Sequence, residues 1–364
     1  MRALNPVLVF LGNRGGGLQL LVDTTQALTE AKQSHTLLLS KNLAATGLVK
    51  VNHYTEVHYF GVPHSAAKLF APNLIFVNFL EISRLILKSI SIRNSIIVQI
   101  MPSPFDFIFD RFIPRNSNKI VRCIHDAKPH LGEKWPTAGS LKRRIASADT
   151  VICFSNYVAD QISFEKSRKL VASLPLRFHS TGSPGTEIQA LSEKLRMSGK
   201  PVILTIGRTM MYKGLDILNE LDSINTEINL VVAGTGKVDI NLPNCGILVD
   251  KWLTDAEFIY LIRSADILLF PYIEASQSGT IPIALAEGKV IVTSDVGGLP
   301  EQVKNYSSAY VYKSEEVESF IGAIDRALTQ GKSEKSRKNE TSKNNSSGNK
   351  SLSSLIELLS AKNT

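Results

Sequence analysis

FPYIEASQSGTIPIALAEGKVIVTSDVGGLPE, residues 270–301, is the most informative segment of this chain. It opens with an apolar strand that ends at Pro271, and a small polar loop follows to Gly279. A helix then runs to Glu287, and a second apolar strand comes after it. A glycine-terminated loop that opens directly into a helix directs backbone N–H groups and the positive end of the helix to one place. That place suits an anionic ligand such as a phosphate.

Outward from this stretch, short continuous apolar runs alternate with helix-length segments. The pattern indicates parallel sheets covered by helices on both faces. It breaks at 179–185, a linker by composition, so we predict an α/β fold with two Rossmann-like domains that face a cleft. Ligands of open α/β sheets bind beyond the carboxyl ends of the strands, which makes the cleft the expected site. The predicted strands are 7–11, 36–40, 74–78, 95–100, 119–124, 150–154 and 170–173, then 202–206, 229–233, 247–250, 266–270 and 289–293.

Four divisions of the chain follow from this pattern. Residues 331–350 contain no large apolar side chain and cannot offset their own ordering entropy, so we expect them to be disordered. The predicted divisions are a first domain over 1–185, a second domain over 186–330, a polar and basic tether over 331–350, and a terminal helix within 351–364 that returns to the first domain.

Composition places the protein among ordinary globular proteins. The chain has 364 residues, of which 43% are apolar and 20% charged, enough for two domains that each bury a core. No run approaches the roughly 20 apolar residues of a spanning helix. The widely spaced Cys123, Cys153 and Cys245 indicate free thiols in a reducing compartment, with no disulfide framework and no metal site. We therefore expect a cytoplasmic protein.

The positive charge is concentrated in the first half of the chain. Residues 1–185 hold 22 Lys and Arg against 11 Asp and Glu, a net charge of +11, whereas the remainder holds 19 against 22. This asymmetry predicts an anionic partner for the first domain. No nucleic-acid-binding module is recognisable, so we expect no nucleic acid. An anionic membrane surface or a lipid-linked acceptor is favoured, and a basic surface that only aids solubility is the alternative.

A second motif, GRTMMYKG at 207–214, places two cations directly after the strand that ends at Ile206. Positive charge at Arg208 and Lys213 would stabilise negative charge that collects on a leaving phosphate. Arginine offers a fork to two oxygens and lysine a point charge. We expect both side chains on the rim of the cleft. Taken alone, the motif is equally a loop with two surface cations.

Together and in this order, the two motifs resemble the retaining nucleotide-sugar glycosyltransferases of the GT-B type, the glycogen-synthase-like family four. The resemblance implies transfer of a sugar from a nucleotide diphosphate donor to a hydroxyl acceptor with retention, in glycan, polysaccharide or glycolipid biosynthesis. It implies an acceptor-binding first domain and a donor-binding second domain. It also implies reaction on one face of the sugar, with no metal and no cofactor, and a catalytic role for Arg208 and Lys213.

The chain departs from that family at the donor loop. Where members carry Glu-x-x-Gly-x4-Glu, this chain has Ser276-Gln-Ser-Gly279-x4-Ala284, which lacks both carboxylates. Glu274 and Glu287 lie nearby but out of register, and Glu287 would face away on a helix. We expect the loop amides around Ser278–Thr280 to hold phosphate, and Ser276 and Gln277 to meet the sugar with neutral hydrogen bonds. The donor's identity stays open at this point.

The first domain adds a glycine-rich loop and a histidine. Gly12-Asn-Arg-Gly-Gly-Gly17 follows the first strand, without the spacing or the acidic residue of a dinucleotide fingerprint. The resemblance implies that this loop closes over the donor phosphates, and that His125, after the strand 119–124, is catalytic and steadies charge near the reacting carbon. The donor-binding residues expected are Gly15, Gly16, Gly17, Gly207, Gly234, Ser276, Gln277, Ser278, Gly279 and Thr280.

Three other functions stay open from the sequence alone. A nucleotide-sugar epimerase or a phosphorylase on the same fold is one class, and a phosphorylase would use pyridoxal phosphate. A non-catalytic sugar- or partner-binding relative is another, suggested by Ser276 and Ala284. A nicotinamide oxidoreductase is least favoured because the fingerprint is missing.

Overall fold

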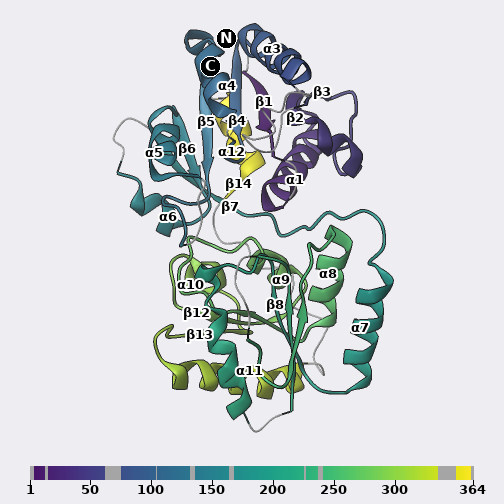
Figure 1. Cartoon of the computed structure of the whole chain (residues 1–364). Helices are drawn as coiled ribbons and strands as arrows, with labels where there is room; N and C mark the ends of the chain where they lie inside the picture. The colour runs from purple at the N-terminus through teal and green to yellow at the C-terminus, as the bar shows by residue number, and fades with distance from the viewer. Residues whose placement is uncertain are drawn as a thin grey trace. The chain divides into compact units, whose positions relative to one another are not determined.

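The computed structural model describes residues 4–12, 15–61, 75–103, 105–131, 136–163, 168–224, 227–236, 241–334 and 350–361. The chain divides into two compact units, labelled by element in Figure 1. Unit 1 comprises Met1–Lys128, Pro136–Pro175 and Asn349–Thr364. Unit 2 comprises Pro129–Trp135 and Leu176–Gly348. The chain therefore passes from unit 1 to unit 2 twice, after Lys128 and after Pro175. The second of these points lies ten residues before the predicted division at 185.

Unit 1 is built on an eight-stranded parallel sheet of order β14-β7-β6-β5-β4-β1-β2-β3. The central strands β1, β4 and β5 are almost entirely buried, as expected for a sheet covered on both faces. The order reverses between β1 and β4, which makes their carboxyl ends the switch point of this sheet. The strands are β1 Asn5–Phe10, β2 His35–Ser40, β3 Thr55–Phe60, β4 Ser95–Gln99, β5 Asn118–Ile124, β6 Thr150–Cys153, β7 Arg168–Ser173 and β14 Lys350–Ser351.

Helices cover both faces of this sheet. On one face, α1 packs with Leu18 and Leu21 in a core that also takes in β1, β2 and β4. On the other, α3 packs with Leu85 and α4 with Phe109. The helices of unit 1 are α1 Gly16–Glu30, α3 Ile75–Ser91, α4 Asp106–Phe112, α5 Ala138–Ala146, α6 Asn156–Gln161 and α12 Leu352–Ala361, with short 3₁₀ segments η1 Lys41–Thr46 and η2 Arg115–Ser117.

One predicted strand is wrong. The run 74–78 was expected to be a strand, but α3 begins at Ile75 and continues for 17 residues. The third strand of the sheet is instead β3, which pairs with β2 from His35 opposite Thr55 to Ser40 opposite Phe60. A short apolar run fits a strand and a buried helix equally well, and here the longer helical pattern prevails.

Residues from the far end of the sequence complete the core of unit 1. β14 pairs parallel with β7, with Lys350 opposite Ala172 and Ser351 opposite Ser173. In the helix α12, Leu352, Leu355 and Ile356 are buried in the same core as α1 and β1. This helix is therefore a structural part of unit 1.

Unit 2 is built on a six-stranded parallel sheet of order β10-β9-β8-β11-β12-β13. Its order reverses between β8 and β11, so the loops after these two strands meet at the switch point. The strands are β8 Val202–Ile206, β9 Asn229–Ala233, β10 Gly246–Val249, β11 Ile267–Phe270, β12 Val290–Ser294 and β13 Ala309–Tyr312. The helices are α7 Thr186–Met197, η3 Met211–Lys213, η4 Leu215–Ser223, α8 Asp255–Ser264, α9 Ile281–Ala286, α10 Leu299–Val303 and α11 Val317–Glu334.

The end of α11 limits the predicted tether. The helix runs to Glu334, four residues into the segment expected to be disordered. The rest of that segment, 335–349, lies outside the described residues. Among the helices that the structure describes, none has the length and apolar character needed to cross a membrane.

Candidate active site

The loops that carry both sequence motifs meet at the switch point of unit 2. Gly207–Lys213 follows β8 and 271–280 follows β11, and these two strands are neighbours in the sheet. Their loops therefore emerge side by side at the carboxyl edge, where open α/β sheets bind ligands. The loop after β9, which starts at Gly234, adjoins them.

Glycines bring two of these loops into direct backbone contact. Gly207 and Gly234 have φ angles of +115° and +134°, which side chains rarely adopt. The Gly207 amide donates to the Ala233 carbonyl at 2.9 Å. A Cβ on Gly234 would lie 2.0 Å from the Gly207 carbonyl oxygen, and one on Gly236 would lie 1.7 Å from that of Thr209. Close packing of the loops therefore already requires Gly234 and Gly236, independently of any ligand.

Lys213 is buried at this switch point, although the sequence placed it on a rim. The residue is 8% exposed, and its Nζ donates to Tyr272 Oη across the β8–β11 boundary. Nζ lies 3.9 Å from the centroid of the Tyr272 ring, within cation–π range. Burial and, to a smaller extent, the nearby charge of Arg208 lower the pKa of Lys213 to about 8, against an opposing effect of Tyr212. Arg208 itself is exposed, so one cation is desolvated and the other reaches solvent.

The loop after β11 is held in place by Tyr272 and Gln302. Burial raises the pKa of Tyr272 to about 12, so it remains a phenol, and its Oη lies 3.3 Å from Ser278 Oγ. From α10, Gln302 accepts from the Ser278 amide at 2.7 Å and donates to the Ser278 carbonyl at 2.9 Å. The Thr280 amide donates to Ser278 Oγ at 3.3 Å.

These contacts correct the expected phosphate-binding role of the loop amides. The Ser278 and Thr280 amides already donate to Gln302 and to Ser278 Oγ. They are therefore not open to a ligand in this conformation. Within the described part of the chain, the Gly279 amide makes no hydrogen bond. Ser276 and Ser278 are buried, which matches a compact loop more than an open cradle.

The two nearby glutamates have structural partners. Glu287 forms a bidentate pair with Arg263, at 3.0 Å from Nε and 2.9 Å from Nη2. This agrees with the expectation that it faces away. Ala284 is fully buried in the core of unit 2, so the position aligned with the family's second carboxylate faces the core instead of a ligand. Neither residue is placed to bind a donor.

Glu274 instead binds the segment that contains His130 and Leu131, which sequence analysis did not assign to this site. Its carboxylate accepts from His130 Nδ1 at 3.2 Å and from the Leu131 amide at 3.1 Å. The His130 ring stacks on Tyr212 with centroids 4.9 Å apart, and Tyr212 contacts Tyr272 edge-on at 6.0 Å. The aromatic rings of Tyr212 and Tyr272 therefore lie close to the Lys213 ammonium. In the phrase CIHDAKPH the sequence drew attention to His125, but His130 is the histidine that belongs to unit 2.

His125 lies in unit 1, directly after β5. Its ring stacks on Phe154 with centroids 4.6 Å apart. Burial lowers the pKa of His125 to about 4, an effect that the charge of Asp126 opposes. The imidazole is therefore neutral at physiological pH. A neutral ring can offer a lone pair or an N–H group to a ligand without adding charge.

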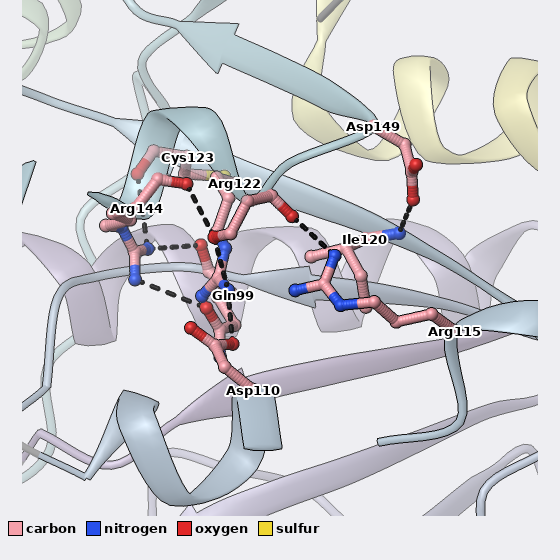
Figure 2. Close-up of polar contacts among 9 residues, drawn as sticks. Gln99, Asp110, Arg115, Ile120, Arg122, Cys123, Arg144 and Asp149 are labelled. Carbon is pink, nitrogen blue, oxygen red and sulfur yellow. Dashed lines mark hydrogen bonds and ion pairs between the residues drawn. The ribbon is translucent and has the colours of Figure 1, made fainter. Parts of the chain in front are cut away.

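Two buried arginines, Arg122 and Arg144, make polar contacts around the ends of β4 and β5 (Figure 2). From α5, Arg144 Nη2 donates to the carbonyls of Gln99 at 3.0 Å and Cys123 at 3.4 Å, which joins the ends of β4 and β5. Its Nη1 donates to Gln99 Oε1 at 3.3 Å. Arg122 is fully buried and pairs with Asp110 from α4. Sequence reasoning counted these cations as surface charge, and their burial removes them from the basic surface.

The glycine-rich loop of unit 1 opens α1. Gly15 precedes the helix with a φ of +83°, and, apart from chain neighbours, no atom of the described residues lies within 4 Å of a Cβ built on Gly15 or Gly16. A Cβ on Gly17 would lie 2.4 Å from Met101 Cγ and 2.7 Å from the Phe10 ring, so packing alone requires this glycine. The two preceding residues of the motif lie outside the described residues.

Cys123 and Cys153 are buried free thiols. Burial raises the pKa of the Cys123 and Cys153 thiols to about 12, which keeps them protonated and unreactive. All three cysteines are free. Within the described ranges, no group of three or more His, Cys, Asp and Glu side chains could hold a metal ion.

Comparison with known proteins gives a family match for unit 2. Residues 187–344 match the family described as glycosyl transferases group 1. A search of curated proteins returned no match.

Solved structures match both units. Sucrose-phosphate synthase from Thermosynechococcus elongatus is 14% identical with a TM-score of 0.65, over 90% of each chain. Anabaena HepE in complex with UDP-glucose is 15% identical with a TM-score of 0.64, over 99% of this chain and 95% of that one. The catalytic domain of starch synthase IV from Arabidopsis thaliana, bound to ADP and acarbose, is 14% identical with a TM-score of 0.63, over 100% and 99%. At these identities the likeness concerns the fold.

Proposed function

Because residues 187–344 match the family of group 1 glycosyl transferases, we propose that the protein moves a sugar from a nucleoside diphosphate donor to a hydroxyl acceptor with retention. One observation carries the proposal. The chain places a buried Lys213 and an exposed Arg208 at the switch point of the unit 2 sheet, where a diphosphate would bind.

The buried cation suits the chemistry of a departing diphosphate. As the bond between the sugar and the phosphate breaks, negative charge collects on the phosphate oxygens. The Lys213 ammonium is held by Tyr272 in a desolvated position, so little reorganisation is needed when that charge develops. A bound diphosphate would favour the charged form of Lys213 and raise its pKa again. Arg208 would add two further donors from the solvent side.

His125 and the glycine-rich loop complete the proposal from unit 1. We assign to the neutral His125 a contact with the sugar near the reacting carbon. Neither Glu274 nor Glu287 is a candidate for a covalent nucleophile, because each is tied to a structural partner. Retention would then arise by reaction on one face, with the leaving phosphate accepting the proton of the acceptor. Gly15 and Gly16 would approach the donor phosphates.

The donor class is proposed from the solved relatives. HepE was solved with UDP-glucose and starch synthase IV with ADP, so sugars linked to uridine diphosphate or adenosine diphosphate are the first donors to test. A glycan or a lipid-linked hydroxyl is the acceptor we propose. Reaction without a metal, and a cytoplasmic location with contact to a membrane surface, also stay proposals.

A thermal-shift screen tests the proposal directly. A ligand that binds only the native state raises the melting temperature. We expect UDP, ADP or GDP to raise the melting temperature of the wild-type protein, and the matching nucleoside monophosphate to raise it less. The shift should largely vanish in Lys213→Met. If no nucleoside diphosphate stabilises the protein at millimolar concentration, the donor site is not where we place it.

A further inference from the structure

The solvent-facing side of α3 is apolar, which is the reverse of an ordinary surface helix. Phe76 is 71% exposed, Phe79 65% and Leu87 67%. Leu80 and Ile90 are exposed as well. With 3.6 residues per turn, these positions lie along one side of the helix, with Ser83 between Leu80 and Leu87. We call this stripe the α3 face.

The α3 face does not belong to the core of unit 1. The opposite side of the helix supplies the core contacts, through Leu85 and the partly buried Ile82 and Ile86. In Figure 1, α3 lies at the outside of unit 1 near β3. Single exposed apolar residues are normal on proteins, but a contiguous patch of large ones marks an interaction surface.

Basic side chains lie beside this apolar stripe. Lys41 and Arg84 both reach Glu81, at 3.9 and 2.9 Å, and Lys88 reaches Glu56 at 3.2 Å. Arg93 sits at the end of the helix, where it donates to the Ile92 carbonyl at 2.9 Å. The charged residues named here are four cations and two carboxylates.

We propose that the α3 face docks unit 1 onto an anionic lipid bilayer. Phe76, Phe79 and Leu87 would enter the boundary between headgroups and acyl chains, while the cations around α3 would meet the lipid phosphates. A second copy of this chain is a poorer occupant, because it would bring the same positive surplus against itself. The inference deepens the proposed function, because it assigns the proposed membrane contact to one surface, and it does not depend on the sugar-transfer chemistry.

Vesicle sedimentation of the full-length protein tests the proposal. The vesicles contain phosphatidylcholine with one third phosphatidylglycerol, or phosphatidylcholine alone. We expect wild-type protein to sediment with the anionic vesicles at low salt. Its partitioning should be about tenfold weaker on neutral vesicles or in high salt, where charges are screened.

Substitutions on the helix separate the α3 face from general basicity. The triple variant Phe76→Gln, Phe79→Gln and Leu87→Gln should lower partitioning by about tenfold for each apolar side chain removed. The matched control is Val51→Gln with Met197→Gln, which replaces two exposed apolar residues elsewhere and should bind like wild type. Melting temperatures of all variants should stay near the wild-type value, because the replaced side chains face solvent.

Three results would overturn the proposal. The first is wild-type protein that stays in the supernatant with anionic vesicles at low salt. The second is a triple variant that binds these vesicles as tightly as wild type. The third is a lipid-free wild-type protein that self-associates in sedimentation velocity, with the triple variant monomeric, because the face would then belong to a second copy. None of these readouts depends on sugar transfer, so the proposed function can fail or hold separately.

Discussion

Lys213 keeps its ammonium group buried against Tyr272, and that position makes a sharp test of its role. In Lys213→Met the apolar stem and the packing against Tyr272 persist, but the charge is lost. We expect sugar transfer to lose on the order of 2–4 kcal/mol of transition-state stabilisation, as for other preorganised charge contacts. The melting temperature should hold or rise, because the lowered pKa of Lys213 shows that its charge is unfavourable in the folded state.

Kinetics and thermal unfolding of the same preparation check this prediction. Lys200→Met is the control, since Lys200 is a partly exposed cation of the same unit paired with Glu227 at 3.2 Å. It should keep wild-type kcat/KM. A Lys213→Met enzyme that transfers sugar at the wild-type rate would remove Lys213 from the mechanism.

The pH dependence of the reaction follows from the same residue. The pKa of Lys213 is about 8 in the folded protein, below its usual value of 10.5. The ammonium form therefore decreases as the pH rises through 8, and kcat/KM should fall above that pH, by about tenfold for each unit. The fall of kcat with pH should begin at a higher pH than the fall of kcat/KM, because a bound diphosphate favours the ammonium form of Lys213. The residual activity of Lys213→Met should not decrease above pH 8. A wild-type activity profile that is flat to pH 10 would contradict the role assigned to Lys213.

The contribution of Lys213 to the free energy of unfolding should rise with pH, whereas its contribution to activity falls. Between pH 8 and 10.5 the unfolded chain holds the proton that the folded protein has released. The contribution of Lys213 to the free energy of unfolding therefore becomes more favourable as the pH rises through this window. Lys213→Met should not show this contribution.

At this scale the sequence located the two cations but not their surroundings. Arg208 and Lys213 are readable because they sit in a short motif after a strand. Tyr272 and Gln302 were missed because their partners, Lys213 and Ser278, lie 59 and 24 residues away in the chain. Burial of Lys213 is likewise a property of packing, which a local pattern does not carry. The loop amides were misjudged for the same reason.

At the scale of elements, α12 offers a direct test of how unit 1 is held together. Ile356 is fully buried in the core formed with α1 and β1. Ile356→Ala should lower the free energy of unfolding by about 2–5 kcal/mol through lost burial and the cavity left behind. Glu357→Ala, at the exposed neighbouring position, should change it little. Urea denaturation compares them, and equal stabilities would mean that α12 is not part of this core in solution.

The elements of the sheets were largely predictable, and the exceptions have a common cause. Continuous apolar runs such as those of β4, β5 and β8 stand out because both faces of a parallel sheet are buried. β3, with the sequence TEVHYF, is only partly buried at the edge of the sheet and lacks that signature. At α3 the apolar solvent-facing stripe adds to the core-facing one. The apolar run at its start therefore resembles a buried strand.

At the scale of the whole molecule, hydrogen exchange with a nucleoside diphosphate can locate the ligand in both units. We expect slower exchange in the loops 207–213 and 271–280 of unit 2, because the proposed donor site is built there. Slower exchange is also expected at Gly15 and Gly16, where a built Cβ would meet no atom of the described residues within 4 Å apart from chain neighbours. Residues 352–361, remote from both loops in sequence and packed in the unit 1 core, serve as the internal reference. Protection confined to unit 2 would remove the glycine-rich loop from the site.

The two-sheet architecture was predictable from the alternation of strands and helices, but the division of the chain was not. Sequence placed one break near 185, whereas the chain also enters unit 2 at Pro129–Trp135. That excursion depends on Glu274 holding His130 and Leu131 across more than 140 residues. Contacts at such separations leave no periodic pattern in the sequence.

The packing of α12 on unit 1 also has a consequence during synthesis. Unit 1 is interrupted between Pro175 and Asn349, and its last strand and helix are translated only after unit 2. At translation rates of about 5–20 residues per second, this delay is roughly 10–35 s. Throughout that time the core surface that receives Leu352, Leu355 and Ile356 stays uncovered on the ribosome. The nascent first unit is thus a natural client for chaperones, while unit 2 has all its strands and can fold before it.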